Sequence, residues 1–326
     1  MKNLKNYIKD YINESYLNEN YLDESVWDIE DNIEDDNKEF ILQEIKKFIK
    51  DNYGRINMDR CKIILDEKKN KYIIDCDHPV FLNSGADQLT NDFFEWGTVK
   101  SSFDCSRSHI TSLKGAPKHV SGDFTCSVCA DLKTLEGAPK KVDRHFYCAY
   151  CSELKTLEGA PKEVGGYFDC HNCPELESLQ GAPESVGGDF NCAYCSELES
   201  LKGAPGYVRG YFKCSECKKL KSLKGAPESV GGTFYCSGCP KLESLKGAPE
   251  KIEWDFDCSK CSKLETLEGS PKYVGGNFDC TNCTELKSLK GAPKKVMLDF
   301  GCTDCPNLHS LDGIGEVGLM IVSDIN

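Results

Sequence analysis

The sequence predicts an α+β protein dominated by a repeat solenoid with one parallel β-sheet, preceded by a small helical and β-hairpin region. Three observations predict this fold. A phrase Phe-x-Cys-x-x-Cys-x-x-Leu recurs nine times at a constant spacing of 22 residues, each phrase ends in a glycine, and a proline follows that glycine in almost every unit. A fixed period of this length is typical of solenoids. The phrases begin at Phe124, Phe146, Phe168, Phe190, Phe212, Phe234, Phe256, Phe278 and Phe300.

Each repeat predicts one extended strand and one tight return. Val164, Phe168 and Cys170 stand at positions 1, 5 and 7 of a segment, so in an extended chain they share one face. Cys173 comes where the strand must turn, and the next two leucines are spaced by three, which favours a short 3₁₀-like return over a full helix. One repeat cannot bury its own apolar residues, so we expect neighbouring repeats to bury one another's.

Glycine has two different roles in the repeat. The glycine that ends each phrase is present in every unit, which predicts a backbone conformation with positive φ. The Gly-Gly pair before the phenylalanine is replaced in some units, for example by Asp143-Arg144, so we interpret it as small for packing. The invariant positions are Gly115, Gly137, Gly159, Gly181, Gly203, Gly225, Gly247, Gly269, Gly291 and Gly313.

The sequence of the repeat resembles that of a known family. Val-x-x-x-Phe-x-Cys-x-x-Cys-x-x-Leu is similar to the leucine-rich repeat phrase Leu-x-x-Leu-x-Leu-x-x-Asn/Cys, with the second cysteine in the Asn/Cys place. The match covers roughly residues 99–323. The Gly-Ala-Pro variant also resembles short repeats in proteins of tailed phages, prophages and gut bacteria. The resemblance implies a curved or nearly straight solenoid with a parallel sheet on one side and short turns on the other.

Four segments follow from these patterns. Residues 1–17 are predicted to form an amphipathic helix, 18–37 an acidic linker, 38–98 a helix and β-hairpin cap, and 99–326 the solenoid with a C-terminal capping strand. Within the cap we expect a helix over 38–52 and a hairpin of strands 61–65 and 72–76. Residues 99–113 are predicted to form a degenerate entry repeat, and residues 317–322 are predicted to form a last apolar strand.

Composition limits the partners and the compartment. The net charge of −13 argues against nucleic acid and anionic membranes as partners. The amino terminus has no apolar run long enough for a secretory signal, and no segment has the length of a membrane span. We therefore expect a cytoplasmic protein of a host cell or a virion component, with its 21 cysteines reduced.

The repeated cysteines allow two interpretations. Cys126, Cys129, Cys148 and Cys151 have the spacing of a four-cysteine zinc site, but a 22-residue period produces this spacing whatever its cause. Because the first cysteine of each pair lies in a strand beside a buried phenylalanine, we favour buried thiols, with structural zinc as the alternative. No catalytic constellation or phosphate loop is recognisable, so we expect neither enzymatic activity nor a cofactor.

The outward side chains of the strand are the candidate binding surface. Over the nine repeats they include seven Asp, four Tyr, two His and one Lys. A tyrosine-dotted acidic strip suits a basic or polar segment of a protein partner. The alternatives are solvated strand positions or a mere spacer, and calcium at the aspartates fits no known loop spacing. The predicted partner-binding residues are Tyr147, Tyr167, Asp169, His171, Asp189, Asn191, Tyr211, Lys213, Tyr235, Asp255, Asp257 and Asp279.

The first residues suggest a second mode of attachment. The opening Met1-Lys2-Asn3-Leu4-Lys5-Asn6-Tyr7-Ile8 is similar to amino-terminal peptides of tailed-phage proteins, some of which serve as capsid-targeting signals. The resemblance implies docking to an assembly through the first helix. We thus expect a non-enzymatic protein-binding or structural scaffold, plausibly from a phage or prophage.

Overall fold

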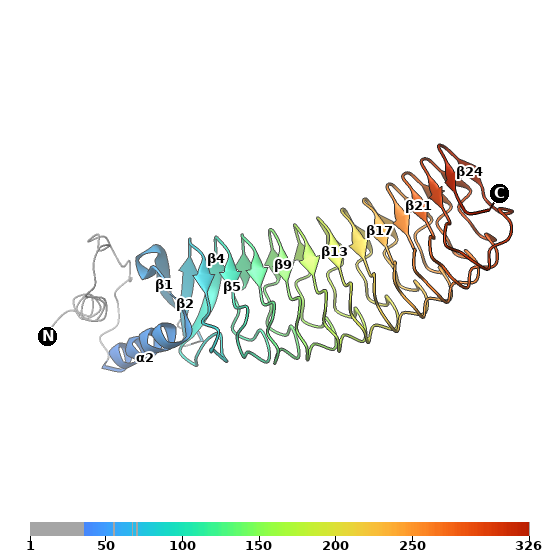
Figure 1. Cartoon of the computed structure of the whole chain (residues 1–326). Coiled ribbons are helices and arrows are strands. Elements are labelled where there is room, and N and C mark those ends of the chain that lie inside the picture. The colour runs from blue at the N-terminus through green and yellow to red at the C-terminus, as the bar shows by residue number, and fades with distance from the viewer. Residues whose placement is uncertain (1–35, 55, 67, 70, 326) are drawn as a thin grey trace, which may run out of the picture.

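The computed structural model describes residues 36–54, 56–66, 68–69 and 71–325 (Figure 1). The chain forms an elongated, gently curved stack of coils with a helix, α2 (Asp36–Asn52), at its N-terminal end. The predicted first helix and nearly all of the acidic linker lie outside the described residues. No helix in the described part of the chain is long and apolar enough to span a bilayer.

The prediction of a parallel β-solenoid is confirmed, but each coil contributes two short strands instead of one. Glu163–Val164 (β10) and Phe168–Asp169 (β11) belong to different sheets, because the chain bends at Gly165 and Gly166 between them. The strands that contain the valine form a 13-stranded sheet, here the valine sheet, and those that contain the phenylalanine form a 12-stranded phenylalanine sheet. The solenoid therefore has two β-faces and one irregular side.

The valine sheet begins with longer strands and continues with two-residue ones. Its strands are β1 (Cys61–Asp66), β2 (Lys71–Cys76), β4 (Phe94–Val99), β6 (His119–Val120), β8 (Lys141–Val142), β10, β12 (Ser185–Val186), β14 (Tyr207–Val208), β16 (Ser229–Val230), β18 (Lys251–Ile252), β20 (Tyr273–Val274), β22 (Lys295–Val296) and β24 (Glu316–Val317). A short 3₁₀ helix, η1 (Met58–Arg60), leads into β1.

The phenylalanine sheet runs alongside in the same order. Its strands are β3 (Val80–Phe81), β5 (Phe103–Asp104), β7 (Phe124–Thr125), β9 (Phe146–Tyr147), β11, β13 (Phe190–Asn191), β15 (Phe212–Lys213), β17 (Phe234–Tyr235), β19 (Phe256–Asp257), β21 (Phe278–Asp279), β23 (Phe300–Gly301) and β25 (Ile321–Val322). Each phenylalanine pairs in register with the phenylalanine one repeat away, as Phe168 does with Phe190. The in-register pairing of the strands therefore depends on the constant length of the repeat.

A continuous stack of phenyl rings fills the interior. From Phe103 to Phe300, successive ring centroids are 5.0–5.6 Å apart, and most ring pairs are nearly parallel. Each of these rings is at most 1% exposed, and the repeat leucines and the cysteines pack around them. Such burial stabilises the fold by about 1.5–3 kcal/mol for each phenylalanine.

The N-terminal end of the ring stack is covered by an aromatic cluster and α2. Trp96 and Tyr53 continue the stack edge-on from Phe103, and the Trp96 Nε1–H donates a hydrogen bond of 2.9 Å to the Tyr53 hydroxyl. The helix buries Ile45 and Ile49 against this end. The predicted helix over 38–52 is confirmed, within α2.

The solenoid begins earlier than the sequence pattern predicts. Strands β1 and β2 form the predicted antiparallel hairpin, but β2 also pairs in parallel with β4, and β3 pairs with β5. Residues 71–82 therefore already form a coil, although they carry no repeat phrase. In the next coil Ser108 replaces the second cysteine, and its buried hydroxyl donates to the Cys105 carbonyl at 2.6 Å.

The other end is open. Strands β24 and β25 each pair with one neighbour, and Leu319, Met320, Ile321 and Val322 are 40–69% exposed. The predicted C-terminal capping strand is therefore a last rung of the stack, with apolar side chains on its surface and no cover among the described residues.

The expectation that all 21 cysteines are reduced is wrong for two of them. Cys61 and Cys76 are directly opposed in the hairpin, with Cα atoms 4.3 Å apart, and they form a disulfide. Opposed cysteines at this separation are within bridging range, whereas the sequence alone did not fix their register. The other 19 cysteines are free and buried.

The glycine that ends each phrase has the positive φ predicted for it, between 85° and 102°. A Cβ atom on Gly181 would also lie 2.5 Å from the Glu158 Cα of the preceding coil. Gly238, between two cysteines, has a φ of 66°, but a Cβ there would meet only the flexible Glu216 side chain. Other repeats hold a side chain at this second position, including Asn172 and Asn282.

We predict that the same substitution has different effects at these two glycines. Gly181→Asn should lower the free energy of unfolding by about 2–4 kcal/mol, because the new Cβ strikes backbone atoms. Gly238→Asn should change it by less than about 1 kcal/mol, because asparagine tolerates this conformation. Urea unfolding followed by circular dichroism measures both values, and equal losses would contradict the distinction.

Candidate functional site

The candidate site is the outer face of the phenylalanine sheet, made of the residues before and after each phenylalanine and after the first cysteine of each pair. Strand register places many of the predicted residues in one row across neighbouring coils. The residues before each phenylalanine and after each first cysteine flank this row. The row consists of Tyr147, Asp169, Asn191, Lys213, Tyr235, Asp257 and Asp279.

Aromatic side chains gather over the first coils of this face. The His145 ring lies between Tyr147 and Tyr167, at centroid distances of 5.7 and 4.4 Å. The Tyr150 ring meets His171 edge-on at 4.7 Å. Tyr150 and Tyr167 remain 49% and 44% exposed. These five residues, here the first aromatic cluster, present large, partly polar rings to solvent.

A second aromatic cluster lies two to four coils further along. Tyr211 and Tyr235 meet edge-on at 6.0 Å, and the Lys213 ammonium lies 5.5 and 5.4 Å from their ring centroids. Both distances are within cation–π range, so the lysine charge is held by the rings. Partial burial raises the pKa of Tyr147 and Tyr235, and nearby aspartates raise it further, so both hydroxyls are neutral donors at neutral pH.

The aspartates of this face have a structural role that the sequence did not reveal. After the phenylalanine, Asp169, Asp257 and Asp279 each accept the backbone N–H two residues on, at 2.8–3.0 Å. Asn191 does the same through its amide oxygen. These side chains close the turn at the strand end, which is a common use of Asp and Asn.

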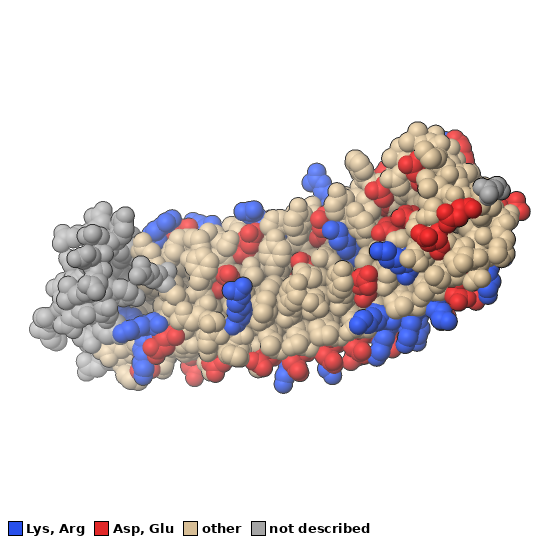
Figure 2. All heavy atoms as spheres, in the orientation of Figure 1, with Lys and Arg blue, Asp and Glu red and all other residues tan. Residues whose placement is uncertain are grey.

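Aspartates before the phenylalanine bond to the next coil instead. Asp189 Oδ1 accepts the Tyr211 N–H at 2.8 Å, and Asp255 Oδ1 accepts the Asn277 N–H at 2.7 Å and its side-chain amide at 3.1 Å. In these bonds one oxygen of each carboxylate is the acceptor, so the negative charge remains on the surface. Acidic side chains are concentrated over the C-terminal coils (Figure 2).

The structure adds residues that sequence reasoning missed. Tyr150 and Tyr194 stand between the two cysteines of their repeats, with φ near 60° and exposures of 49% and 58%. Trp254, in a Gly-Gly place, is 63% exposed. The sequence signal for these residues was a large aromatic side chain at a position that has left-handed φ or that is glycine in other repeats. Both are unusual choices for a purely structural site.

The second cysteine of every repeat forms a hydrogen bond with the preceding coil. Its Sγ lies 3.2–3.4 Å from the carbonyl oxygen of the first cysteine, or its equivalent, one coil earlier, as for Cys217 and Cys192. The thiol donates and the carbonyl accepts. These bonds run through all nine repeats and link successive coils.

This geometry fits buried thiols better than zinc ligands. A zinc site brings at least three donors onto one ion at about 2–2.3 Å. Among the described residues, the solenoid repeats place no three metal-ligand atoms within reach of one another. Burial also raises the pKa of Cys195, Cys239 and Cys283 to about 12, which opposes the thiolate form that zinc requires.

A hollow with a volume of about 610 Å³ lies near the N-terminal end, between residues 87–92 and the first coils. Its lining includes Lys118 and Glu95, and Glu95 pairs with Lys69 at 2.8 Å and with Lys118 at 3.6 Å. A mostly polar lining of mixed, paired charge is typical of a solvated hollow, because small-molecule sites are largely apolar.

No protein-family model, no curated protein and no solved structure matches this chain. Function must therefore be argued from the surfaces and side chains described above.

We predict that the aspartate bonds between coils depend on an oxygen acceptor and not on charge. Asp255→Ala should lower the free energy of unfolding by about 1 kcal/mol, because two donors of Asn277 lose their acceptor. Asp255→Asn should lower it by less than about 0.5 kcal/mol, since Asn277 itself accepts the Asp299 N–H at 3.1 Å through an amide oxygen. Equal losses in urea unfolding would show that charge matters instead.

We predict that stability falls as pH rises above about 9. The folded state keeps its thiols protonated up to about pH 12 at positions such as Cys195, whereas unfolded thiols ionise near pH 9. Between these values the unfolded state binds fewer protons, so it gains stability relative to the folded state by about 1.4 kcal/mol per thiol and pH unit. Urea midpoints at pH 7 to 10 test this, and a midpoint unchanged up to pH 10 would contradict it.

Proposed function

We propose that the protein is a non-enzymatic scaffold that binds a protein partner through the outer face of the phenylalanine sheet. The observation that carries this proposal is the pair of aromatic clusters, the first around His145 and the second around Lys213, displayed on one β-face. Tyrosines supply large contact area at low cost in side-chain entropy, and they are enriched where protein interfaces bind most strongly.

Rigidity of the face supports the proposal. The strands under both clusters are fixed by the register of the buried ring stack, so the tyrosines lose little further freedom when a partner binds. Neighbouring strands lie about 4.8 Å apart, so the two clusters together extend over several coils. A surface of this kind suits an extended segment that lies along the stack.

Charge favours a basic or polar segment. Seven aspartates against one lysine and two histidines leave the face acidic, even though carboxylates also bind backbone N–H groups. An acidic strip attracts basic segments and repels phosphates, which disfavours nucleic acid as a partner.

We also propose that the chain is a divergent leucine-rich repeat protein. In support, the second cysteine occupies the Asn/Cys place of that phrase and bonds to the backbone of the preceding coil. A phage or prophage setting, a cytoplasmic or virion location and docking through residues 1–17 rest on the sequence resemblance, and they stay predictions. Capture from a native lysate with and without residues 1–17 tests the docking.

We predict that removing exposed tyrosines weakens partner binding without unfolding the protein. A displayed random-peptide library selected on the full chain should yield basic or polar sequences. Tyr167→Ala with Tyr211→Ala should weaken their binding at least 30-fold, since each truncation at the centre of an interface costs about 1–2 kcal/mol. Titration calorimetry with one selected peptide measures the loss.

The matched control uses tyrosines of the other sheet. Tyr207, which is exposed, and Tyr273, which is partly buried, lie on strands of the valine sheet, so Tyr207→Ala with Tyr273→Ala should leave the affinity unchanged. Equal weakening by both pairs, or selection of acidic peptides, would contradict the proposed face. Failure to select any binding peptide would favour the spacer interpretation.

A further inference from the structure

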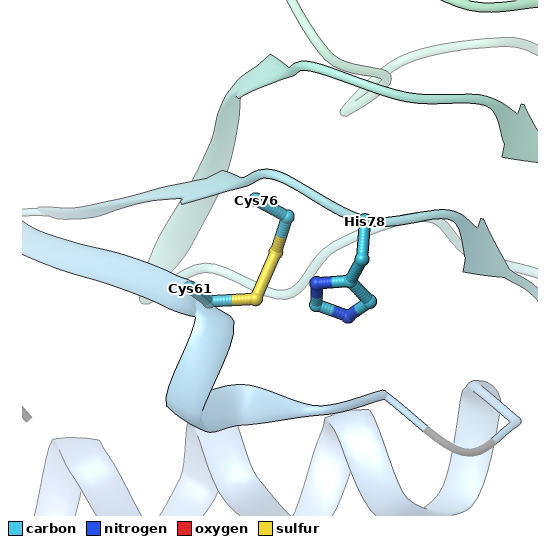
Figure 3. Close-up of side chains that lie close together, drawn as sticks. All are labelled: Cys61, Cys76 and His78. Atoms are coloured by element: carbon cyan, nitrogen blue, oxygen red, sulfur yellow. A yellow bond between two sulfur atoms is a disulfide. The ribbon is translucent and has the colours of Figure 1, made fainter. Parts of the chain in front are cut away.

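The N-terminal cap holds a cluster of metal-binding side chains outside the repeats. The Sγ atoms of Cys61 and Cys76 and a ring nitrogen of His78 all lie within 4.8 Å of one another (Figure 3). Strand pairing places Cys61 opposite Cys76, and the chain bends directly after Cys76, at Asp77 and His78, where the His78 ring lies beside the two sulfurs.

Among the described residues, no group forms a hydrogen bond with either ring nitrogen of His78. His78 is 93% buried, and neither Nδ1 nor Nε2 has a partner, although Asp77 Oδ1 lies 3.7 Å from Nδ1, beyond hydrogen-bond range. Leaving a buried polar atom unpaired costs about 1–3 kcal/mol, so such atoms in native proteins usually have a function. A buried imidazole directed at two sulfurs is the arrangement of a metal ligand.

We propose that, when the Cys61–Cys76 disulfide is reduced, Cys61, Cys76 and His78 bind one zinc ion. Two thiolates and an imidazole are donors that zinc prefers, and they leave one tetrahedral position for water. Asp77, whose carboxylate pairs with Arg60 at 2.9 Å, lies beside this cluster, with its Oδ1 3.7 Å from His78 Nδ1. The disulfide and the zinc site exclude each other, because both need the same two sulfurs.

A phosphine and one water convert the disulfide into two thiols and a phosphine oxide, so sulfur gains two electrons and two protons. Binding of Zn²⁺ by the two thiols then releases two protons, because the ligands are thiolates. This site is independent of the repeat cysteines, which donate hydrogen bonds to carbonyl oxygens.

The test counts zinc on the full chain in both redox states. Protein is reduced with a phosphine, freed of it without oxygen, mixed with ZnCl₂, gel-filtered, and analysed for metal. We expect about one zinc per reduced chain and none per oxidised chain. Co²⁺ in place of Zn²⁺ should add thiolate-to-cobalt absorption and the strong visible bands of a tetrahedral ion. No zinc on the reduced chain would overturn the proposal, and this comparison needs no substitution.

Variants identify the ligands. Cys61→Ser and Cys76→Ser should lose the ion, and His78→Ala should bind it at least about tenfold more weakly. Cys129→Ser is the control, because Ser108 occupies the same place one repeat earlier, and it should still bind one ion. Circular dichroism confirms that each variant folds. If Cys61→Ser binds zinc fully, or if several ions per chain stay bound in each of Cys61→Ser, Cys76→Ser and His78→Ala, the metal belongs to the repeats and the proposal is overturned.

Discussion

The structure depends on one constraint: every full repeat must place its phenyl ring against that of the preceding coil and its second thiol against a backbone carbonyl of that coil. The rings stack at about 5 Å from Phe103 to Phe300, and the thiols donate to carbonyl oxygens in every full repeat. An insertion of one residue in a strand would move the ring from the interior to the surface. This explains why the period of 22 residues is kept throughout the nine full repeats.

The same constraint decides which residues can carry a function. Interior columns are occupied by Phe, Cys, Leu and Val, so variation is confined to the outward columns. Even there, part of the chemistry is structural, because Asp189 and Asp255 bond to the next coil and Asp169 closes its own turn. The tyrosines have no comparable backbone role, which makes them the better guide to a binding surface than the more numerous aspartates.

Regular features of the repeat could be predicted from the sequence, whereas features that depend on local geometry could not. Periodicity was sufficient to predict the solenoid, the buried phenylalanines and the positive φ at positions such as Gly181. Each predicted strand is divided between two sheets because the chain bends, as it does at Gly165 and Gly166. The period-2 pattern does not reveal this bend, because the pattern continues across it unchanged. The first coil, over 71–82, carries no repeat phrase because it packs against the cap. On the candidate face, strand register places Lys213 and its neighbours in one row, whereas the hydrogen bonds of the aspartates depend on local geometry that the sequence pattern does not contain.

The two ends of the stack differ in a way that bears on where chemistry can occur. In a solenoid each coil is stabilised mainly by its neighbours, so a terminal coil loses the contacts of one neighbour unless another element covers it. At the N-terminal end, α2, Tyr53 and Trp96 cover the rings, and the hairpin that starts the valine sheet holds the Cys61–Cys76 pair beside His78. In the repeats a thiol such as Cys195 lies between two coils of the same kind, and burial raises its pKa. The cap interrupts that repetition, and it is there that two sulfurs and an unpaired imidazole converge.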